Sequence, residues 1–202
     1  MDDGADYIRI YDNNLKMMKR ITPTSNKHII QPVLILGFSW SEKEERLGAV
    51  LQDFTISFWE GKGKFAKEET FFAKEMQTRI WYLNYCGKWV TTNTKNQVLV
   101  WDIKHQTSNQ LSRNASTKIS DICEIANFKL VAVASFDKKI TLWDLTNGKV
   151  FCQMKLFDGS ADILRYSLNF DYLVSSGFET TIKIHRIDIS KDYTLVEKLT
   201  GH

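Results

Sequence analysis

The chain has 202 residues, 27 basic and 24 acidic side chains, and 43% hydrophobic residues. This length allows one or two globular domains, and the apolar fraction is too high for a disordered chain. The near balance of charge excludes the basic excess that is typical of nucleic-acid binders and of polybasic membrane binders. No run of 18 apolar residues occurs, so no membrane-spanning helix is predicted. We therefore expect a folded, soluble chain whose partners are neither nucleic acids nor membranes.

The cysteines indicate a reducing compartment. Cys86, Cys123 and Cys152 are widely spaced and form no Cys-x-x-Cys pair, which excludes a disulfide framework and a zinc ribbon. The first residues are acidic and contain no apolar segment of the kind that opens a secretory signal. The sequence therefore predicts a cytoplasmic protein.

Five short segments share one pattern, in which alternating aliphatic residues are followed by a ring and usually by an acid. They are Ile8–Asp12, Ile56–Glu60, Val98–Asp102, Ile140–Asp144 and Ile182–Arg186. Their rings, which we call the anchors, are Tyr11, Trp59, Trp101, Trp143 and His185. Successive anchors are 48, 42, 42 and 42 residues apart. Alternation predicts half-buried strands, and the equal spacings predict a structural repeat of 42 residues.

Three further strands are predicted around each anchor strand. First strands are expected at Val33–Trp40, Ile80–Tyr85, Ile119–Ile125 and Ile163–Leu168. Second strands and their turns are expected at Gly48–Asp53, Trp89–Lys95, Leu130–Asp137 and Tyr172–Glu179, and fourth strands at Val150–Leu156 and Leu195–Leu199. No helical period is long enough to compete, so the sequence predicts an all-β radial repeat of four short strands.

Two segments carry a resemblance to a known family. The segment Ser135–Asp144 resembles the signature of WD40-repeat β-propellers, and Leu199–His202 resembles the Gly-His that opens a repeat. This resemblance implies an all-β WD40-type propeller, partial, with about four and a half blades of a propeller of seven or more. The expected divisions of 1–202 are a blade end near 1–25 and blades near 29–74, 76–112, 117–157 and 161–200. Because closure needs more blades, we expect the chain to be a fragment or the ordered part of a longer protein.

The repeats depart from the polar pattern of the family, in which a His, a Ser or Thr, an Asp and a Trp often form a hydrogen-bonded tetrad. Trp101 is preceded by Lys95 where the family has an acid, and His185 replaces a Trp. The residues matched to repeat positions are Asp53, Trp59, Trp101, Ser135, Asp137, Trp143, Gly201 and His202. No complete tetrad can be assembled, so we expect the blades to depend on apolar packing more than on this network.

A search for catalytic and metal-binding patterns gives no candidate, so no catalytic residue, metal or cofactor is predicted. The histidines His28, His105, His185 and His202 lie in different periods without ligand spacing. Cys123 and Cys152 lie inside predicted strands, where a small buried hydrophobe is favoured over a nucleophile. The run Gly61–Lys64 lacks the full phosphate-loop pattern and is interpreted as a hairpin turn.

The resemblance implies that the top face, formed by the turns between second and third strands and the links between blades, binds other proteins. The residues just before the turn acid, which commonly project onto that face in the family, are Gln52, Thr94, Phe136 and Phe178. The interpretation that both phenylalanine rings fold back onto their own turns stays open. We expect a non-catalytic scaffold or adaptor in a multi-subunit complex that takes no small-molecule substrate. Its divergent repeats are similar to those of cytoskeletal propellers of cilia and axonemes.

Two other functions remain open. A propeller enzyme would hold an active site in its central channel, but the predicted first strands are mostly apolar or aromatic. A module for ubiquitin or a phosphorylated ligand would need a basic cluster on one rim, and the arginines are scattered along the chain.

Overall fold

The computed structural model describes residues 7–23, 33–61, 65, 68–111, 117–155, 160–178, 180–188 and 193–200. Within these ranges the regular structure is entirely strand, apart from one 3-10 turn at Ala126–Phe128. This confirms the predicted all-β class. Among the same residues, no helix has the length and apolar character needed to cross a bilayer. The chain divides into two compact units, unit 1 (1–82 and 88–109) and unit 2 (83–87 and 110–202).

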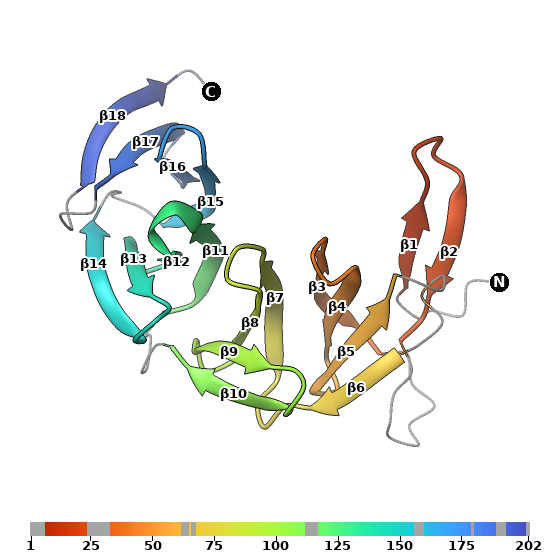
Figure 1. Ribbon diagram of the computed structural model, residues 1–202. Coiled ribbons are helices and arrows are strands. Elements are labelled where there is room, and N and C mark those ends of the chain that lie inside the picture. The colour runs from red at the N-terminus through yellow and green to blue at the C-terminus, as the bar shows by residue number, and fades with distance from the viewer. Residues whose placement is uncertain are drawn as a thin grey trace. The chain divides into compact units, whose positions relative to one another are not determined.

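The strands of unit 1 form one two-stranded and two four-stranded sheets (Figure 1). The two-stranded sheet holds β1 (Ile8–Tyr11) and β2 (Met17–Ile21). The next sheet holds β3 (Ile35–Ser41), β4 (Arg46–Leu51), β5 (Thr55–Glu60) and β6 (Glu68–Phe72). The third holds β7 (Gln77–Leu83), β8 (Lys88–Asn93), β9 (Val98–Asp102) and β10 (Thr107–Gln110). Strands adjacent in sequence are adjacent in each sheet, as expected for a repeat built from local hairpins.

Unit 2 repeats the four-stranded arrangement twice. Its first sheet holds β11 (Ile119–Ile125), β12 (Leu130–Ser135), β13 (Lys139–Asp144) and β14 (Lys149–Lys155). Its second sheet holds β15 (Ala161–Ser167), β16 (Tyr172–Gly177), β17 (Thr181–Ile187) and β18 (Tyr193–Thr200).

The strand register shows that the 42-residue period is a structural period. In each four-stranded sheet the anchor of the third strand pairs with the residue twelve positions earlier on the second strand. The four pairs are Leu47 with Trp59, Trp89 with Trp101, Val131 with Trp143, and Leu173 with His185. Because a shift of one residue would turn every side chain to the other face, identical pairing gives the four anchors equivalent positions.

The core of unit 1 includes a cluster of aromatic rings. The ring of Trp89 lies 4.9 Å from both Phe58 and Tyr82, and Phe71 lies 5.2 Å from Trp101, measured between centroids. A Cβ at Gly48 would come within 2.6 Å of the Trp89 ring. Glycine is therefore required there, because rings of this size leave no room for another carbon.

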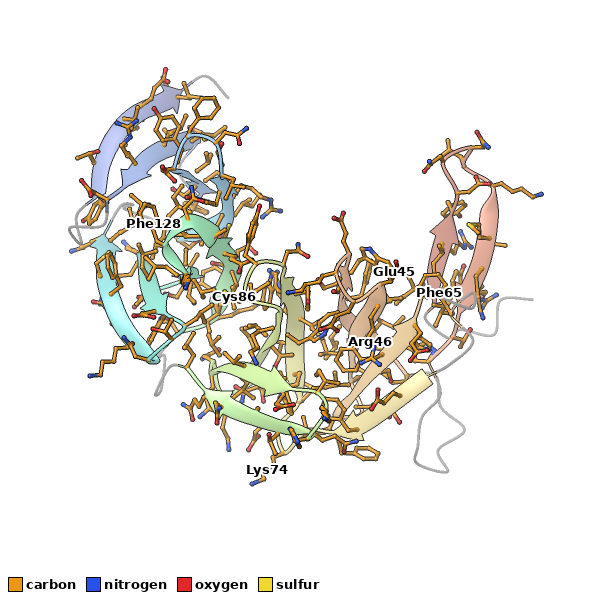
Figure 2. The ribbon with its side chains drawn as sticks, viewed as in Figure 1. Glu45, Arg46, Phe65, Lys74, Cys86 and Phe128 are labelled. Atoms are coloured by element: carbon orange, nitrogen blue, oxygen red, sulfur yellow. The ribbon has the colours of Figure 1, made fainter. Side chains whose placement is uncertain are left out.

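The core of unit 2 is mainly aliphatic. Its fully or almost fully buried residues are Ile125, Leu130, Ala132, Ala134, Ile140, Leu142, Met154, Ala161, Leu164, Leu173 and Ile187. Phe128 packs against this cluster from the turn after β11 (Figure 2). The carboxylate of Asp121 on β11 accepts the Leu164 N–H at 2.9 Å and pairs with Arg165 at 3.0 Å. The two sheets of unit 2 are thus joined by apolar packing and by one charged contact between their first strands.

The tryptophans differ in how deeply they are buried, although three of them occupy equivalent anchor positions. Trp59 and Trp101 are buried, and Trp89 is buried too, but Trp143 is only half-buried. Trp40 is 41% exposed and rests against Phe65, with 5.9 Å between ring centroids. Sequence spacing identifies equivalent positions but not how much of each side chain the neighbouring sheet covers.

Candidate partner-binding surface

We define the upper end of a four-stranded sheet as the end that holds the turn between its second and third strands. The first residue of this turn donates its backbone N–H to the carbonyl of the residue eighteen positions earlier, just before the first strand. These bonds are Gln52 to Leu34 (3.0 Å), Thr94 to Met76 (3.0 Å), Phe136 to Lys118 (2.9 Å) and Phe178 to Ser160 (3.1 Å). All four donor residues have exposed side chains. The side chains predicted to contact a partner therefore occupy equivalent, exposed positions.

Short polar side chains hold the upper turns in fixed conformations. Asp53 Oδ1 accepts the Thr55 N–H at 3.1 Å, and Asn93 Oδ1 accepts the Lys95 N–H at 3.0 Å. The Ser135 hydroxyl donates to the Asp137 carboxylate. Such bonds are typical of Asx and related turns. In these three sheets the third residue of the turn has a left-handed backbone, at Phe54 (φ 71°), Asn96 (φ 58°) and Lys138 (φ 68°).

Two phenylalanines of unit 2 are exposed at its upper turns. Phe136 is 47% exposed and Phe178 is 84% exposed, so neither ring belongs to the buried core. Lys118 Nζ lies 5.7 Å from the centroid of the Phe136 ring, within the range of a cation–π contact. Phe178 follows Gly177, at which a Cβ would lie 1.9 Å from the Ser160 carbonyl oxygen.

The upper ends of the two sheets of unit 2 lie beside each other. The Ser120 hydroxyl near the start of β11 donates to the Ala161 carbonyl at the start of β15. Phe136 donates its N–H to Lys118, two residues before Ser120, and Phe178 donates its N–H to Ser160, directly before Ala161. We define the upper surface of unit 2 by five exposed residues at these upper ends, namely Lys118, Phe136, Lys138, Lys155 and Phe178. The exposed carboxylate of Asp162, which accepts a bond from the Ser160 hydroxyl at 2.9 Å, lies at the same end.

The upper ends of the four-stranded sheets of unit 1 carry different side chains. Gln52 and Thr94 are small or polar, and Lys95 forms an ion pair with Glu75. Phe54, which is 40% exposed, was not among the predicted contact residues. Its signal in the sequence was a bulky residue directly after the turn acid Asp53.

The sheet of β7–β10 contains a buried polar relay in addition to the apolar packing expected from the sequence. The Trp101 Nε1–H donates to Thr91 Oγ1 at 2.7 Å. The Thr91 hydroxyl donates to Gln77 Oε1 at 2.5 Å, and Gln77 Nε2 donates to the Glu75 carbonyl at 2.7 Å. Gln77 and Thr91 are 1% and 0% exposed. Satisfied buried networks of this kind fix a unique packing.

The equivalent positions of unit 2 hold an incomplete version of the relay. The residues 84 positions after Gln77, Thr91 and Trp101 are Ala161, Ser175 and His185. Within the described part of the chain, Ser175 Oγ and His185 Nδ1 are buried and have no hydrogen-bond partner. Burial, together with the charge of Lys183, lowers the pKa of His185 to about 4. The imidazole is therefore neutral at pH 7.

The side chains that could act as a nucleophile or as metal ligands lie in environments that do not favour these roles. Burial, followed by the charge of Asp121, raises the pKa of the Cys123 thiol to about 12, so the thiolate nucleophile is absent at neutral pH. His105 Nδ1 lies 2.8 Å from the Asp102 carboxylate in an exposed turn. In the described ranges no three His, Cys, Asp or Glu residues are grouped to hold a metal ion. The predicted positions His28, Lys62–Lys64, Gly201 and His202 lie outside the described residues.

Comparison with known proteins supports the fold. No family model matches the sequence, and no curated protein matches it. Among solved structures, the chain is similar to the β-propeller domain of Cps50 (Swd1) from Myceliophteria thermophila, with a TM-score of 0.75 and 13% identity. The likeness covers 96% of this chain. The fold is that of a WD40-type β-propeller.

The extent of the likeness limits what it implies. The chain spans 65% of the length of the Cps50 domain that it matches. In all, 1385 chains of solved structures show a match, so the propeller fold is too widespread to indicate one activity. The function must therefore be argued from the residues that this propeller exposes.

Proposed function

We propose that this propeller is a non-catalytic scaffold that binds another protein through the upper surface of unit 2. The exposure of Phe136 and Phe178, at equivalent positions of neighbouring sheets, carries the proposal. Large aromatic side chains are enriched among the residues that dominate binding energy at protein interfaces. Exposed apolar groups rimmed by polar ones are a common feature of such interfaces.

The rigidity of the upper turns favours binding. The turn of Phe136 is tied to Lys118 by its backbone and braced by the bond from Ser135 to Asp137. The turn of Phe178 is held against Ser160 by a backbone bond. Because the backbone of each phenylalanine is held by a hydrogen bond to the residue before the first strand, little backbone conformational entropy is lost when a partner covers the rings.

An enzymatic role has less support from the side chains that would perform it. The Cys123 thiol is protonated at neutral pH because burial raises its pKa. The His185 ring is buried in the core beside Tyr193, where a substrate cannot reach it. We place the scaffold in a multi-subunit cytoplasmic assembly, with the cytoskeleton of cilia or axonemes as the specific setting to examine, on the basis of the divergent repeats alone.

Affinity capture with matched variants tests the proposal. The tagged chain and its Phe136→Ala/Phe178→Ala variant are expressed in the native cell, and the captured proteins are identified by mass spectrometry. We expect the double variant to lose at least one partner that the unmodified chain retains. Tyr85→Ala/Phe170→Ala is the control, because these rings are 61% and 62% exposed but lie in turns between first and second strands. Equal capture by all three proteins would contradict the proposal.

A further inference from the structure

The upper end of the sheet of β11–β14 gathers positive charge. Lys139 on β13 lies directly opposite Lys155 on β14. Lys138 is in the adjoining turn, and the carbonyl of Lys118 accepts the bond from Phe136. Adjacent strands are about 4.8 Å apart, so four lysines from three separate parts of the sequence share one end of one sheet.

This arrangement works against the stability of the free protein. Like charges directly opposite each other in neighbouring strands are destabilising. Asp137 offsets part of the charge, since its carboxylate lies 3.8 Å from Lys139 Nζ. At the other end of the same two strands, Lys149 lies opposite Asp144, which is the favourable pairing.

The positive charge continues into the neighbouring sheet of unit 2. Lys183 on β17 lies opposite Lys198 on β18. Lys183 is 9% exposed, and its charge helps to lower the pKa of His185. Local rules of pairing are most often broken where function requires it. Because Lys183 is buried, the pair of Lys139 with Lys155 is the one that points to an anionic group approaching unit 2 from outside.

We propose that the upper surface of unit 2 binds an acidic peptide segment that carries at least one large apolar side chain. This deepens the proposed function and rests on it. Aspartate or glutamate side chains of the partner lie against Lys118, Lys138 and Lys155, and the apolar side chain packs on Phe136 and Phe178. The surface holds both kinds of group, and Lys118 Nζ lies 5.7 Å from the centroid of the Phe136 ring.

Lysine chemistry favours carboxylates spread along a peptide. An ammonium group is a point charge on a flexible stem, whereas the planar guanidinium of arginine gives the bidentate geometry suited to a phosphate. The upper surface of unit 2 contains three lysines and no arginine. The arginines are scattered along the sequence and predict no basic rim. Strand pairing nevertheless brings lysines from separate parts of the sequence to one end of the sheet, and this end is basic.

Peptides of defined composition test the inference with the full chain. The probe is a fluorescein-labelled twelve-residue peptide of Asp, Glu and Leu, and its control has Asn and Gln in place of every Asp and Glu. We expect the acidic peptide to bind at least about tenfold more tightly by fluorescence anisotropy, with weaker binding as salt rises from about 50 to 200 mM. A phosphoserine peptide of equal charge is a third probe, and tighter binding of that probe would overturn the assignment to carboxylates.

Variants locate the binding. Lys118→Gln/Lys138→Gln/Lys155→Gln should weaken binding of the acidic peptide about tenfold or more, because the complementary charges lie within one Debye length. The control Lys104→Gln/Lys129→Gln/Lys149→Gln removes the same number of exposed lysines away from the upper end and should leave the dissociation constant within about twofold. Thermal melting is measured for both to show that they are folded. An equal loss in the two triple variants would overturn the inference, because binding would then follow net charge alone.

The two proposals fail differently. If Phe136→Ala/Phe178→Ala abolishes capture of a native partner but the acidic peptide does not bind, the acidic class is wrong and the scaffold function stands. If the acidic peptide binds through the three lysines but native capture does not depend on the phenylalanines, the inference on ligand class stands and the proposed contact surface of the scaffold is wrong.

Discussion

Three equivalent positions of the repeat differ between the sheet of β7–β10 in unit 1 and the sheet of β15–β18 in unit 2. In unit 1, Trp101, Thr91 and Gln77 form a buried chain of hydrogen bonds. In unit 2 the equivalent His185 and Ser175 are buried without partners, since alanine stands where glutamine would be needed. Equivalent backbone positions therefore do not ensure equivalent hydrogen bonds between side chains, because the network forms only when every donor and acceptor residue is present.

The upper ends of the two units also differ, in the pairing of their lysines and in their exposed side chains. In unit 1, the exposed Lys95 of one upper turn pairs with Glu75. Unit 2 sets Lys139 opposite Lys155 and exposes Phe136 and Phe178 beside them. Among the described residues, buried hydroxyls without a hydrogen-bond partner occur in both units, as at Ser57 and Ser175, so the feature that suits unit 2 for binding is its upper end. Four substitutions or titrations test this contrast.

The largest loss of unfolding free energy is expected for a substitution among the aromatic core residues of unit 1. Trp89→Ala removes a ring that is 1% exposed and contacts Phe58 and Tyr82. Loss of such a ring costs about 3–5 kcal/mol of unfolding free energy, which urea denaturation measures. Trp143→Ala, at the half-buried anchor of unit 2, should cost clearly less. Equal losses would show that the cores depend on these tryptophans to the same degree.

Acid should weaken unit 2 through His185. Its pKa is lowered to about 4 in the folded chain from about 6.5 in the unfolded chain. Between these values the unfolded state binds more protons, so stability is lost as the pH falls from 6.5 to 4, by at most about 3 kcal/mol. His185→Phe should flatten this part of the pH profile without loss at pH 7, because it removes an unpartnered buried nitrogen. An unchanged profile in the variant would show that another group is responsible.

The relay of unit 1 should contribute less to the free energy of unfolding than the core of this unit does, but more than a surface contact does. Thr91→Val keeps the shape and leaves Trp101 Nε1 and Gln77 without their shared partner, at a cost of about 1–3 kcal/mol. Ser175→Ala at the equivalent position of unit 2 should be close to neutral, and Thr107→Val on an exposed strand provides the surface reference. If Ser175→Ala costs as much as Thr91→Val, the two units handle these hydroxyls alike and the contrast is lost.

The smallest change in stability is expected at the upper surface of unit 2. Phe136→Ala/Phe178→Ala removes exposed rings, so the unfolding free energy should change by no more than about 0.5 kcal/mol. The melting temperature should therefore move little while partner capture is lost. A large drop in melting temperature with capture retained would identify the rings as part of the core.

Much of the candidate surface could be predicted, because it depends on the repeat. Counting 42 residues from turn to turn gave Gln52, Thr94, Phe136 and Phe178, and the same backbone bond is present at each. The relay could not be predicted, because Gln77 and Trp101 are 24 residues apart and meet only when β7, β8 and β9 pair in register. The lysines at 118, 138, 139 and 155 were overlooked for the same reason.

The sequence by itself determined the strand-built repeat, its period and the equivalence of the anchors, because alternation and spacing are properties of the chain. Only the tertiary structure decided that Trp59 and Trp101 are buried while Trp143 is half covered. It also decided that the hydroxyl of Thr91 is satisfied and that of Ser175 is not. Burial, hydrogen bonding and charge pairing depend on the side chains that a neighbouring strand or sheet brings within a few ångströms, and the repeat period does not specify those side chains.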